Sequence, residues 1–452
     1  MREVVGQVGA ALVVLTSAYV ALTLVLSRFR RPVRRDAPPP LQYVFLVPAL
    51  NEERVIGRTL ESLTRLPRER TTVLVVDDGS DDRTAEIVRS FEDRKVVLLR
   101  RRLPDARHGK GAALNAGYRG VQRAVAAVGW DPARVVVGVV DGDGDLPADL
   151  YDVVDRYFED ARTGALQIQV RIRNRARMIG RWQDYEFHLF ASLTQSAREN
   201  LGTVGLGGNG QFVRFDALES VGADGPWSDC LTEDLDLGLR LAMAGWHNRF
   251  TADASVEQQG VESLRRLVRQ RTRWMQGHFQ CYRHLPALFR SQLPTVTVLD
   301  FSYYLLAPTV TLVAPLVFVL PFAILVASVA FNAGAYVSGP GAVGYLLLVY
   351  AASFGPLHVL GWLYWRRSGD IGWGRTLVLI HVLALFSWVW YAAGWLAVGR
   401  IVTRRGGWSK TDRVSEGPAA GGPGADHEVP GRAGSPSGGR ARPIVAPPAP
   451  VS

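Results

Sequence analysis

Cysteine is scarce in this sequence. Only Cys230 and Cys281 occur among 452 residues, and they lie too far apart to form a CxxC pair. The sequence therefore supports neither a disulfide framework nor a zinc site, because both need more cysteines at closer spacing. Two reduced thiols fit a catalytic domain that faces the cytoplasm.

Acidic residues are also fewer than basic ones. The chain has 42 Asp and Glu against 52 Lys and Arg, which gives a formal net charge of +10. Nucleic acid is one partner for such an excess, but the basic clusters at 28–35, 364–370 and 400–407 each follow an apolar run directly. Basic residues that flank apolar runs are typical of the cytoplasmic loops of membrane proteins. We therefore expect a membrane as a partner and no nucleic acid.

An uncharged apolar run occupies residues 4–26. Its length is enough to span a bilayer, which takes roughly 20 residues. A signal peptide is the competing interpretation, but the run is long for one, its basic cluster comes after it, and no A-x-A cleavage site follows. We predict a transmembrane anchor at 1–27 with its N-terminus outside, and a basic, proline-rich linker at 28–41 on the inside.

Apolar residues return in the last third of the chain, in runs at 299–331, 341–365 and 374–399. The basic clusters place both the catalytic domain and the tail inside, which requires an even number of crossings, whereas three runs are present. Either 299–331 forms a re-entrant hairpin, or one run lies flat, or the tail is outside, and the sequence does not decide among these. The predicted segments after the catalytic domain are an interfacial helix at 284–298, a transmembrane region at 299–399, a basic juxtamembrane segment at 400–413 and a disordered tail at 414–452.

The region 42–283 has the pattern of a separate α/β domain. Runs rich in β-branched residues end in polar turns, and helical stretches separate them. This alternation predicts a doubly wound, mostly parallel, Rossmann-like sheet, and near-continuous apolar strands fit its buried interior. The predicted strands are 42–50, 72–80, 95–100 and 134–144, and the predicted helices are 52–65, 81–92 and 110–128. Ligands bind beyond the carboxyl ends of such strands, where acids occur at 77–78 and 141–145.

The segment "DGDGD" places Asp141, Asp143 and Asp145 at alternate positions after a strand. Three carboxylates so close repel one another unless a cation lies among them. The spacing resembles the start of a calcium loop, but Leu146 and Asp152 stand where that loop needs glycine and glutamate, so an EF-hand is excluded. A site that holds Mg²⁺ or Mn²⁺ against a diphosphate fits better, and a solvated acidic loop is the alternative.

Three other motifs are ambiguous when each is taken alone. Asp77 and Asp78 end a strand, where they could bind a ligand or form an ordinary turn and helix cap. Lys110 stands between glycines at a helix start, where it could neutralise a diphosphate. The segment "GLGGNG" (205–210) matches G-x-G-x-x-G, but it follows no clear strand, so we reject a nicotinamide site.

Acids crowd the start of the predicted helix in "LTEDLDLGLRLAMAGW" (231–246). The helix dipole accommodates acids in a first turn, and this alone explains why they are tolerated there. Downstream, "ESLRRLVRQRTRW" (262–274) is a basic amphipathic stretch that could hold an anionic lipid surface. The spacing of Gln270, Arg273 and Trp274 within it favours a binding role.

Taken in order, these motifs resemble a membrane-bound family 2 glycosyltransferase, a group that includes cellulose, chitin and hyaluronan synthases and membrane glycolipid glucosyltransferases. The matching pieces are "VPALNEE", "VVDDGSDD", "GKGAALNAG", "DGDGD", "GNGQFVRFDAL", "TEDLDLGLRL", "QRTRW" and "GWSKTDR". The resemblance implies a GT-A fold, a nucleotide-sugar donor and a divalent metal, Mg²⁺ or Mn²⁺. It also implies a protein of the plasma membrane with its catalytic domain in the cytoplasm.

The resemblance also implies roles for individual residues, carried over by position. Asp234 is the expected general base, and Asp143 with Asp141 the expected metal pair. A glycine, Gly142, stands between these two acids, where alanine is commoner in the family. The expected donor-binding residues are Ala49, Glu52, Asp77, Asp78, Lys110, Asp141, Asp143 and Arg273, and the expected acceptor-binding residues are Glu233, Gln270 and Trp274.

The implied reaction is direct attack by an acceptor hydroxyl on a UDP-hexose or UDP-N-acetylhexosamine. A single base with no second carboxylate nucleophile inverts the anomeric centre and gives a β-linkage. Few membrane segments favour a lipid or short glycan acceptor, and a processive polysaccharide synthase is the alternative. An inactive membrane scaffold is the alternative of another class, and the intact acids argue against it. The sequence leaves the oligomeric state open.

Overall fold

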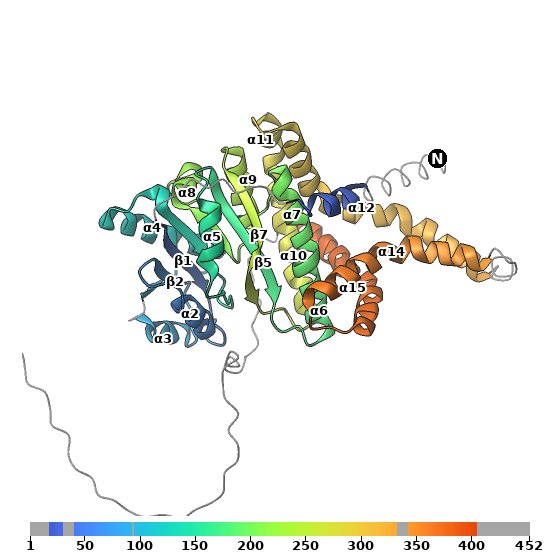
Figure 1. Ribbon diagram of the computed structural model, residues 1–452, viewed down its shortest axis with the longest axis horizontal. Coiled ribbons are helices and arrows are strands. Elements are labelled where there is room, and N and C mark those ends of the chain that lie inside the picture. The colour runs from blue at the N-terminus through green and yellow to red at the C-terminus, as the bar shows by residue number, and fades with distance from the viewer. Residues whose placement is uncertain (1–17, 30–39, 93–94, 332–341, 405–452) are drawn as a thin grey trace, which may run out of the picture. The chain divides into compact units, whose positions relative to one another are not determined.

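The computed structural model describes residues 18–29, 40–92, 95–331 and 342–404 (Figure 1). Residues 18–26 are helical and belong to the end of the predicted anchor. Most of the anchor and of the 28–41 linker, and everything after residue 404, lie outside the described residues, so those assignments remain predictions.

The centre of the fold is a seven-stranded sheet with the strand order β3-β2-β1-β4-β6-β5-β7. Neighbouring strands are parallel, except that β6 runs antiparallel to both β4 and β5. The strands are β1 (Gln42–Ala49), β2 (Thr71–Asp77), β3 (Val96–Arg100), β4 (Val135–Val139), β5 (Thr163–Ile172), β6 (Gln211–Arg214) and β7 (His247–Gln258).

The structure confirms the predicted mostly parallel sheet and adds three strands that were not predicted, β5, β6 and β7, of which β6 is reversed. The loop before β6 lies at the carboxyl edge of β4, where the Gly210 N–H donates to the Val139 carbonyl at 2.9 Å. A strand that starts at the carboxyl edge of β4 must run antiparallel to β4, as β6 does. The predicted strand 134–144 is wrong in its end, because β4 stops at Val139 and the acidic loop turns away from the sheet.

Side chains alternate along β1 and supply two cores. Tyr43 and Phe45 pack with α2, α3 and α5 on one face, while Val44 and Leu46 pack with α4, α8 and α9 on the other. Helices therefore cover both faces of the sheet, as a doubly wound fold requires. These helices are α2 (Ile56–Thr64), α3 (Thr84–Arg89), α4 (Lys110–Val128), α5 (Leu150–Phe158), α8 (Phe215–Gly222) and α9 (Glu233–Met243).

A second group of helices packs beside the sheet, at its β5–β7 end. Figure 1 shows α10 and α15 side by side, and the Arg400 side chain of α15 donates to Gln276 Oε1 of α10 at 2.8 Å. The helices are α6 (Met178–Asp184), the π-helix η3 (Tyr185–Ala191), α7 (Ser192–Leu201), α10 (Leu264–Gln280), α11 (Leu285–Arg290), α12 (Thr295–Phe331), α14 (Ala342–Ser368) and α15 (Trp373–Val402); the short 3₁₀ turns are η2 (Pro132–Arg134) and η4 (Cys281–His284).

The apolar C-terminal helices differ in two ways from the expected segments. The stretch 284–298 is not one helix, because α11 ends at Arg290 and α12 begins at Thr295. The run 299–331 lies within the single helix α12, so it does not fold back as a hairpin. Thr295–Val313 and Trp373–Val402 are long and apolar enough to cross a membrane, judged by length and composition alone.

Candidate active site

Loops after β1 and β2 interlock at the carboxyl edge of the sheet. The Asp78 N–H donates to the carbonyl of Ala49 at 2.8 Å, and the Asn51 N–H donates to Ser80 Oγ at 2.9 Å. Asn51 Oδ1 in turn accepts from the Asp81 N–H at 3.0 Å. The carbonyl of Ala49, a predicted donor-binding residue, therefore helps to fix the neighbouring loop that carries the acids.

Asp77 and Asp78 are both buried, and each has an arginine partner from the end of β3. Arg100 Nε lies 3.2 Å from Asp77 Oδ2, and Arg101 donates to Asp78. Burial raises the pKa of Asp78, while the charge of Arg101 opposes that shift. Positive charge at this corner keeps both carboxylates in place for a hydrogen-bonding ligand.

The three aspartates of the "DGDGD" loop have different partners. Asp141 accepts from Lys110 Nζ at 2.6 Å, and the buried Asp143 accepts from the Gln259 N–H at 2.8 Å. Asp145 pairs with Arg58 Nε at 2.8 Å and exchanges backbone hydrogen bonds with Glu257. The first two acids therefore belong to the site, while Asp145 anchors the loop to β7.

Glu52 explains the glycine between the first two acids. Its side chain lies so close to Gly142 that an added Cβ would meet Glu52 Cγ at 2.9 Å. Thr59 Oγ1 also donates to the Gly142 carbonyl at 2.9 Å. Glycine in place of the commoner alanine at position 142 thus leaves room for the side chain of Glu52, which is 9% exposed.

The N-terminus of α9 brings a second set of acids to the same place. Lys110 Nζ lies 3.7 Å from Glu233 Oε1, in addition to its contact with Asp141. A Cβ built on Gly208 would lie 2.8 Å from Asp234 Oδ2 and 3.0 Å from Lys110 Nζ. The acid at the end of β4 and the two acids at the start of α9 therefore surround one lysine.

Burial and the charges of their neighbours shift the pKa values of Lys110, Glu233 and Asp234. Burial opposes the charge of Lys110, but the surrounding carboxylates raise its pKa above the ordinary value, so it stays protonated. Burial raises the pKa of Glu233 to about 7, and Asp234 adds to this shift. The charge of Lys110 and, with a smaller effect, that of Arg273 lower the pKa of Glu233 and oppose this shift. Burial also raises the pKa of Asp234, and Lys110 holds it down.

Asp236, the third acid of the α9 turn, faces away from Lys110. It is fully buried and accepts from Arg283 Nη2 at 2.6 Å, from Arg240 Nε at 2.8 Å and from His284 Nε2 at 2.7 Å. Burial works against its charge, but these three donors hold the pKa of Asp236 well below its usual range. Asp236 therefore joins α9 to η4, the turn that follows α10.

We expect Asp236→Asn to lower the free energy of unfolding by about 3 kcal/mol, because removing one partner from a buried ionic cluster leaves the others uncompensated. A carboxyl with a depressed pKa stabilises the folded state above its unfolded pKa of about 3.9, and this contribution is lost as the pH falls. The stability gap between wild type and variant should therefore be full at pH 7 and narrow toward pH 3.5 in chemical denaturation. An equal gap at both values would contradict the assignment.

Helix α10 carries the Gln270, Arg273 and Trp274 motif, and a buried arginine inside it organises the indole. The Arg271 guanidinium lies 4.0 Å from the Trp274 ring centroid and donates to Glu186 Oε2 at 2.6 Å. Arg271 also donates to Gln270 Oε1 at 2.9 Å. Trp274 is half-buried, so the ring is fixed by Arg271 while part of it stays accessible.

Three contributors to the site were missed from sequence. Gly208 and Asn209 begin the matching piece "GNGQFVRFDAL" but have no role assigned to them from sequence, and Asn209 Oδ1 accepts from the Asp141 N–H at 3.1 Å. Gln259 follows the end of β7 and fixes Asp143. The polar turn after the β-branched pattern of β7 was the available signal for Gln259.

The oxygen donors at the end of β4 fit a hard divalent cation. Asp141 and Asp143 supply carboxylates, and an ion such as Mg²⁺ takes one or two of these together with substrate phosphates. Within the described part of the chain, no group of three or more His, Cys, Asp and Glu side chains is arranged to hold a metal without such help. The pair therefore fits an ion that binds together with an anionic ligand.

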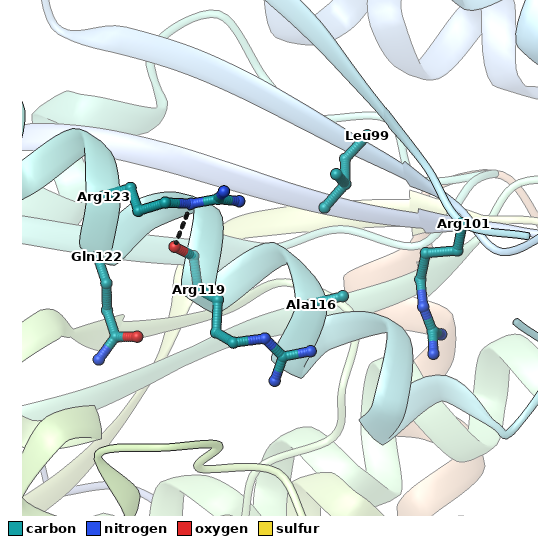
Figure 2. Close-up of a pocket in the computed structure, with 6 residues that line it drawn as sticks. All are labelled: Leu99, Arg101, Ala116, Arg119, Gln122 and Arg123. Atoms are coloured by element: carbon teal, nitrogen blue, oxygen red, sulfur yellow. Dashed lines mark hydrogen bonds between the residues drawn. The ribbon is translucent and has the colours of Figure 1, made fainter. Parts of the chain in front are cut away.

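A separate hollow of about 490 Å³ lies between β3 and α4. Figure 2 shows its lining side chains, which are Leu99, Arg101, Ala116, Arg119, Gln122 and Arg123. None of them is a predicted site residue, although Arg101 is the partner of Asp78. The hollow is thus a feature of the sheet edge and not the acidic site.

The sequence is similar to those of known proteins. A family model described as "Glycosyltransferase like family 2" matches residues 38–277. A beta-monoglucosyldiacylglycerol synthase of Synechocystis sp. is 36% identical over 280 residues, which cover 58% of this chain and 55% of that protein. A poly-beta-1,6-N-acetyl-D-glucosamine synthase of Staphylococcus aureus is 26% identical over 263 residues, which cover 58% of this chain and 59% of that protein. The chain therefore matches little more than half the length of these relatives.

A solved structure shares the fold. A mannosyltransferase from Pyrobaculum calidifontis, in complex with GDP-Man and Mn²⁺, aligns with a TM-score of 0.56 at 19% identity. The alignment covers 88% of this chain and 99% of that chain. At this level of identity the likeness shows the fold alone, which is GT-A.

Proposed function

The chain belongs to glycosyltransferase family 2, and from this premise we propose that it transfers a sugar from a nucleotide-sugar donor to a hydroxyl of a lipid or glycan, with inversion. The observation that carries the proposal is the position of Lys110, 2.6 Å from Asp141 and 3.7 Å from Glu233. Asp141, which follows β4, and Glu233, at the N-terminus of α9, thereby meet at the positively charged side chain of Lys110. This arrangement suits a reaction that separates a diphosphate from a sugar while a hydroxyl loses a proton.

The donor side of the site is formed by the strand tips. Asp77 and Asp78, which are fixed by arginines, would accept hydrogen bonds from the nucleotide base. Asp143 and Asp141 would hold Mg²⁺ or Mn²⁺ beside the diphosphate. When bound, such an ion stabilises negative charge on the departing nucleoside diphosphate. Lys110 and Arg273 add fixed positive charge to the same region, where it acts on the developing charge.

The acceptor side is formed by α9 and α10. Asp234 is partly buried at the first turn of α9, and its carboxylate would take the acceptor proton. Trp274, which Arg271 holds in place, would offer its ring to the apolar face of a sugar. A single base and direct attack give a β-linked product, and Glu233 and Gln270 would orient the acceptor.

A lipid acceptor is the version we favour. The Synechocystis relative, a beta-monoglucosyldiacylglycerol synthase, is more similar to this chain than the staphylococcal polysaccharide synthase. Attachment to a membrane would bring a lipid hydroxyl to α9 without a transport channel. A processive polysaccharide synthase is the second candidate, and the staphylococcal relative supports it.

The proposed membrane arrangement has two crossings after the catalytic domain, α12 and α14, with α15 flat on the surface. Asp370, just before α15, pairs with Arg175 and Arg181 at 2.7 Å each. Near the other end of α15, Arg400 contacts Gln276. A 30-residue helix is about 45 Å long, and one that the catalytic domain holds near both ends would lie along the membrane instead of crossing it.

The outer face of α15 supports a lipid partner. Exposed apolar residues recur at helical spacing on the side away from buried Leu379, Leu383 and Ala393. The exposed members are Val378, Leu385, Trp388, Trp395 and Leu396. An α15 that lies in the plane of the membrane also explains why three apolar runs are present where an even number of crossings is needed. Only α12 and α14 would then cross, and two crossings leave both the catalytic domain and the tail inside.

Topology reporters test this arrangement. Green fluorescent protein fused after residue 404 should fluoresce, because the fusion point lies in the cytoplasm. Alkaline phosphatase inserted between α12 and α14 should be active, because that segment lies outside. Phosphatase activity at the C-terminal fusion would show instead that α15 crosses the membrane.

The proposed function is tested by incubating purified protein with radiolabelled UDP-, GDP- and dTDP-sugars, Mg²⁺ or Mn²⁺, and membrane lipid extracts. We expect label in the organic phase on a small lipid product. Label in high-molecular-weight material would favour the polysaccharide synthase. Failure to turn over any donor would favour a non-enzymatic scaffold.

A further inference from the structure

Two cysteines that lie 51 positions apart in the sequence meet beside the site. Cys230 Sγ and Cys281 Sγ are 3.7 Å apart, and both thiols are free and buried. Cys230 lies two residues before Thr232, the residue that precedes α9. Cys281 follows the last residue of α10, the helix that carries Arg273 and Trp274.

The loop and the helix that carry these thiols are already in contact. The Leu231 N–H donates to Gln280 Oε1 at 2.9 Å, and Cys230 Sγ donates to the Gly277 carbonyl at 3.3 Å. A Cβ built on Gly277 would lie only 2.6 Å from the Thr232 nitrogen. The sulfurs therefore need only a local adjustment to reach the bonding distance of about 2.05 Å.

We propose that Cys230 and Cys281 form a site of reversible oxidation, at which a peroxide converts the two thiols into a disulfide that ties the loop before α9 to the end of α10. No other cysteine occurs in the chain, so no thiol of the same molecule competes. The effect on catalysis described below rests on the proposed function, whereas formation of the bond does not.

The two thiols are not equivalent. The hydrogen bond from Cys281 and those from Thr232 lower the pKa of Cys230, although burial opposes this. The same contact with Cys230, together with burial, raises the pKa of Cys281. Cys230 is also the more accessible of the two, since it is 5% exposed and Cys281 is 0% exposed. We therefore assign Cys230 as the sulfur that peroxide reaches first, and Cys281 as the resolving thiol.

The reaction balances with hydrogen peroxide as oxidant. The Cys230 thiolate attacks one peroxide oxygen, forming an S–O bond and breaking the O–O bond, and the released hydroxide takes up the thiol proton as water. Cys281 then loses its proton and attacks Cys230 Sγ, so that the S–S bond forms and the S–O bond breaks with release of a second water. Two sulfurs are oxidised and two peroxide oxygens are reduced.

The bond should slow transfer because it pulls on the residue that precedes the proposed base. Thr232 contacts both sulfurs, with Oγ1 at 3.6 Å from Cys230 Sγ and 3.8 Å from Cys281 Sγ. When the two sulfurs move from 3.7 Å apart to the bonding distance of about 2.05 Å, we expect Thr232 to be displaced. The first turn of α9, which carries Asp234, should move with it. A misplacement of about 1 Å can cost a reaction about 100-fold, so we expect at least a tenfold loss of rate.

The test compares the full-length protein with Cys281→Ser and Cys230→Ser after treatment with hydrogen peroxide. In the wild type, alkylation under denaturing conditions should find both thiols blocked, and the intact monomer should be lighter by the mass of two hydrogens. Dithiothreitol should restore both thiols. Cys281→Ser should instead trap a sulfenic acid at Cys230, detectable with dimedone, and Cys230→Ser should leave Cys281 free to alkylate.

Each outcome bears on a different part of the proposal. Thiols of the wild type that remain open to alkylation, or that become sulfenic acids without joining, overturn the oxidation site. A disulfide that leaves the transfer rate of an active enzyme unchanged overturns its coupling to α9. If the reduced protein turns over no donor while the disulfide still forms, the proposed function fails and the oxidation site stands.

Discussion

Replacing Asp234 with Asn is expected to reduce sugar transfer about 1000-fold while donor binding is retained. General base catalysis by a positioned side chain contributes roughly 100- to 10,000-fold, and an amide cannot accept the acceptor proton. The substitution keeps the shape of the side chain, including the Oδ1 atom that accepts from the Leu235 N–H at 2.7 Å. Initial rates with a saturating donor measure the effect.

Asp216→Asn is the matched control for this variant. Asp216 also lies in the first turn of a helix, α8. Because α8 follows the antiparallel strand β6, it begins at the opposite edge of the sheet from the site. We expect near-normal rates for Asp216→Asn, and an equal loss in both variants would mean that the effect is structural and not due to the loss of a base.

The second large effect is expected for Lys110→Met, which should lower the transfer rate about 100- to 1000-fold. That range is the usual consequence of removing one group that stabilises charge developing in the transition state. The loss should appear in kcat as well as in donor KM, because Lys110 lies beside both the donor-side Asp141 and the acids of α9.

The pH profile separates this role of Lys110 from a purely structural one. Lys110 lowers the pKa of Glu233 and of Asp234, so its removal should raise both. The proposed base must be ionised to act, and the acidic limb of the profile should therefore move to higher pH. Lys95→Met is the control, since Lys95 is exposed, lies just before β3 and donates through Nζ to the Arg68 carbonyl. An unshifted profile in Lys110→Met would contradict the proposed charge cluster.

Local patterns were sufficient to predict the strands and helices that build the donor side. The β-branched runs and their polar ends placed β1 and β2 within a few residues, because buried parallel strands are nearly continuous in apolar character. The run 95–100 also placed β3, although β3 is an edge strand of which only Val96 is buried. Strands β5, β7 and β6 were not predicted. The four residues of β6, with an arginine at the end, carry too little pattern. Its reversed direction depends on where the preceding loop lies, which is a tertiary property.

Within the site, the sequence could not separate acids of different roles. Asp234 and Asp236 stand in the same helical turn, yet a rotation of about 100° per residue puts them on different sides of α9. Only the structure shows that Asp236 meets Arg283 and His284, from a segment 47 residues further along the chain. Hydropathy likewise could not separate the two apolar faces of α15, one of which packs on the domain while the other is exposed.

The central claim is that the strand-tip acids and the α9 acids form one nucleotide-sugar site, in which the former bind the donor and the latter serve the acceptor. Calorimetric titration of UDP, GDP and dTDP in the presence of Mn²⁺ tests it most directly, with wild type, Asp143→Asn and Asp234→Asn compared. The account predicts that one of these nucleotides binds the wild type and Asp234→Asn with similar affinity and binds Asp143→Asn at least tenfold more weakly. Equal affinity for Asp143→Asn, or no binding of any of the three nucleotides to the wild type, would contradict it.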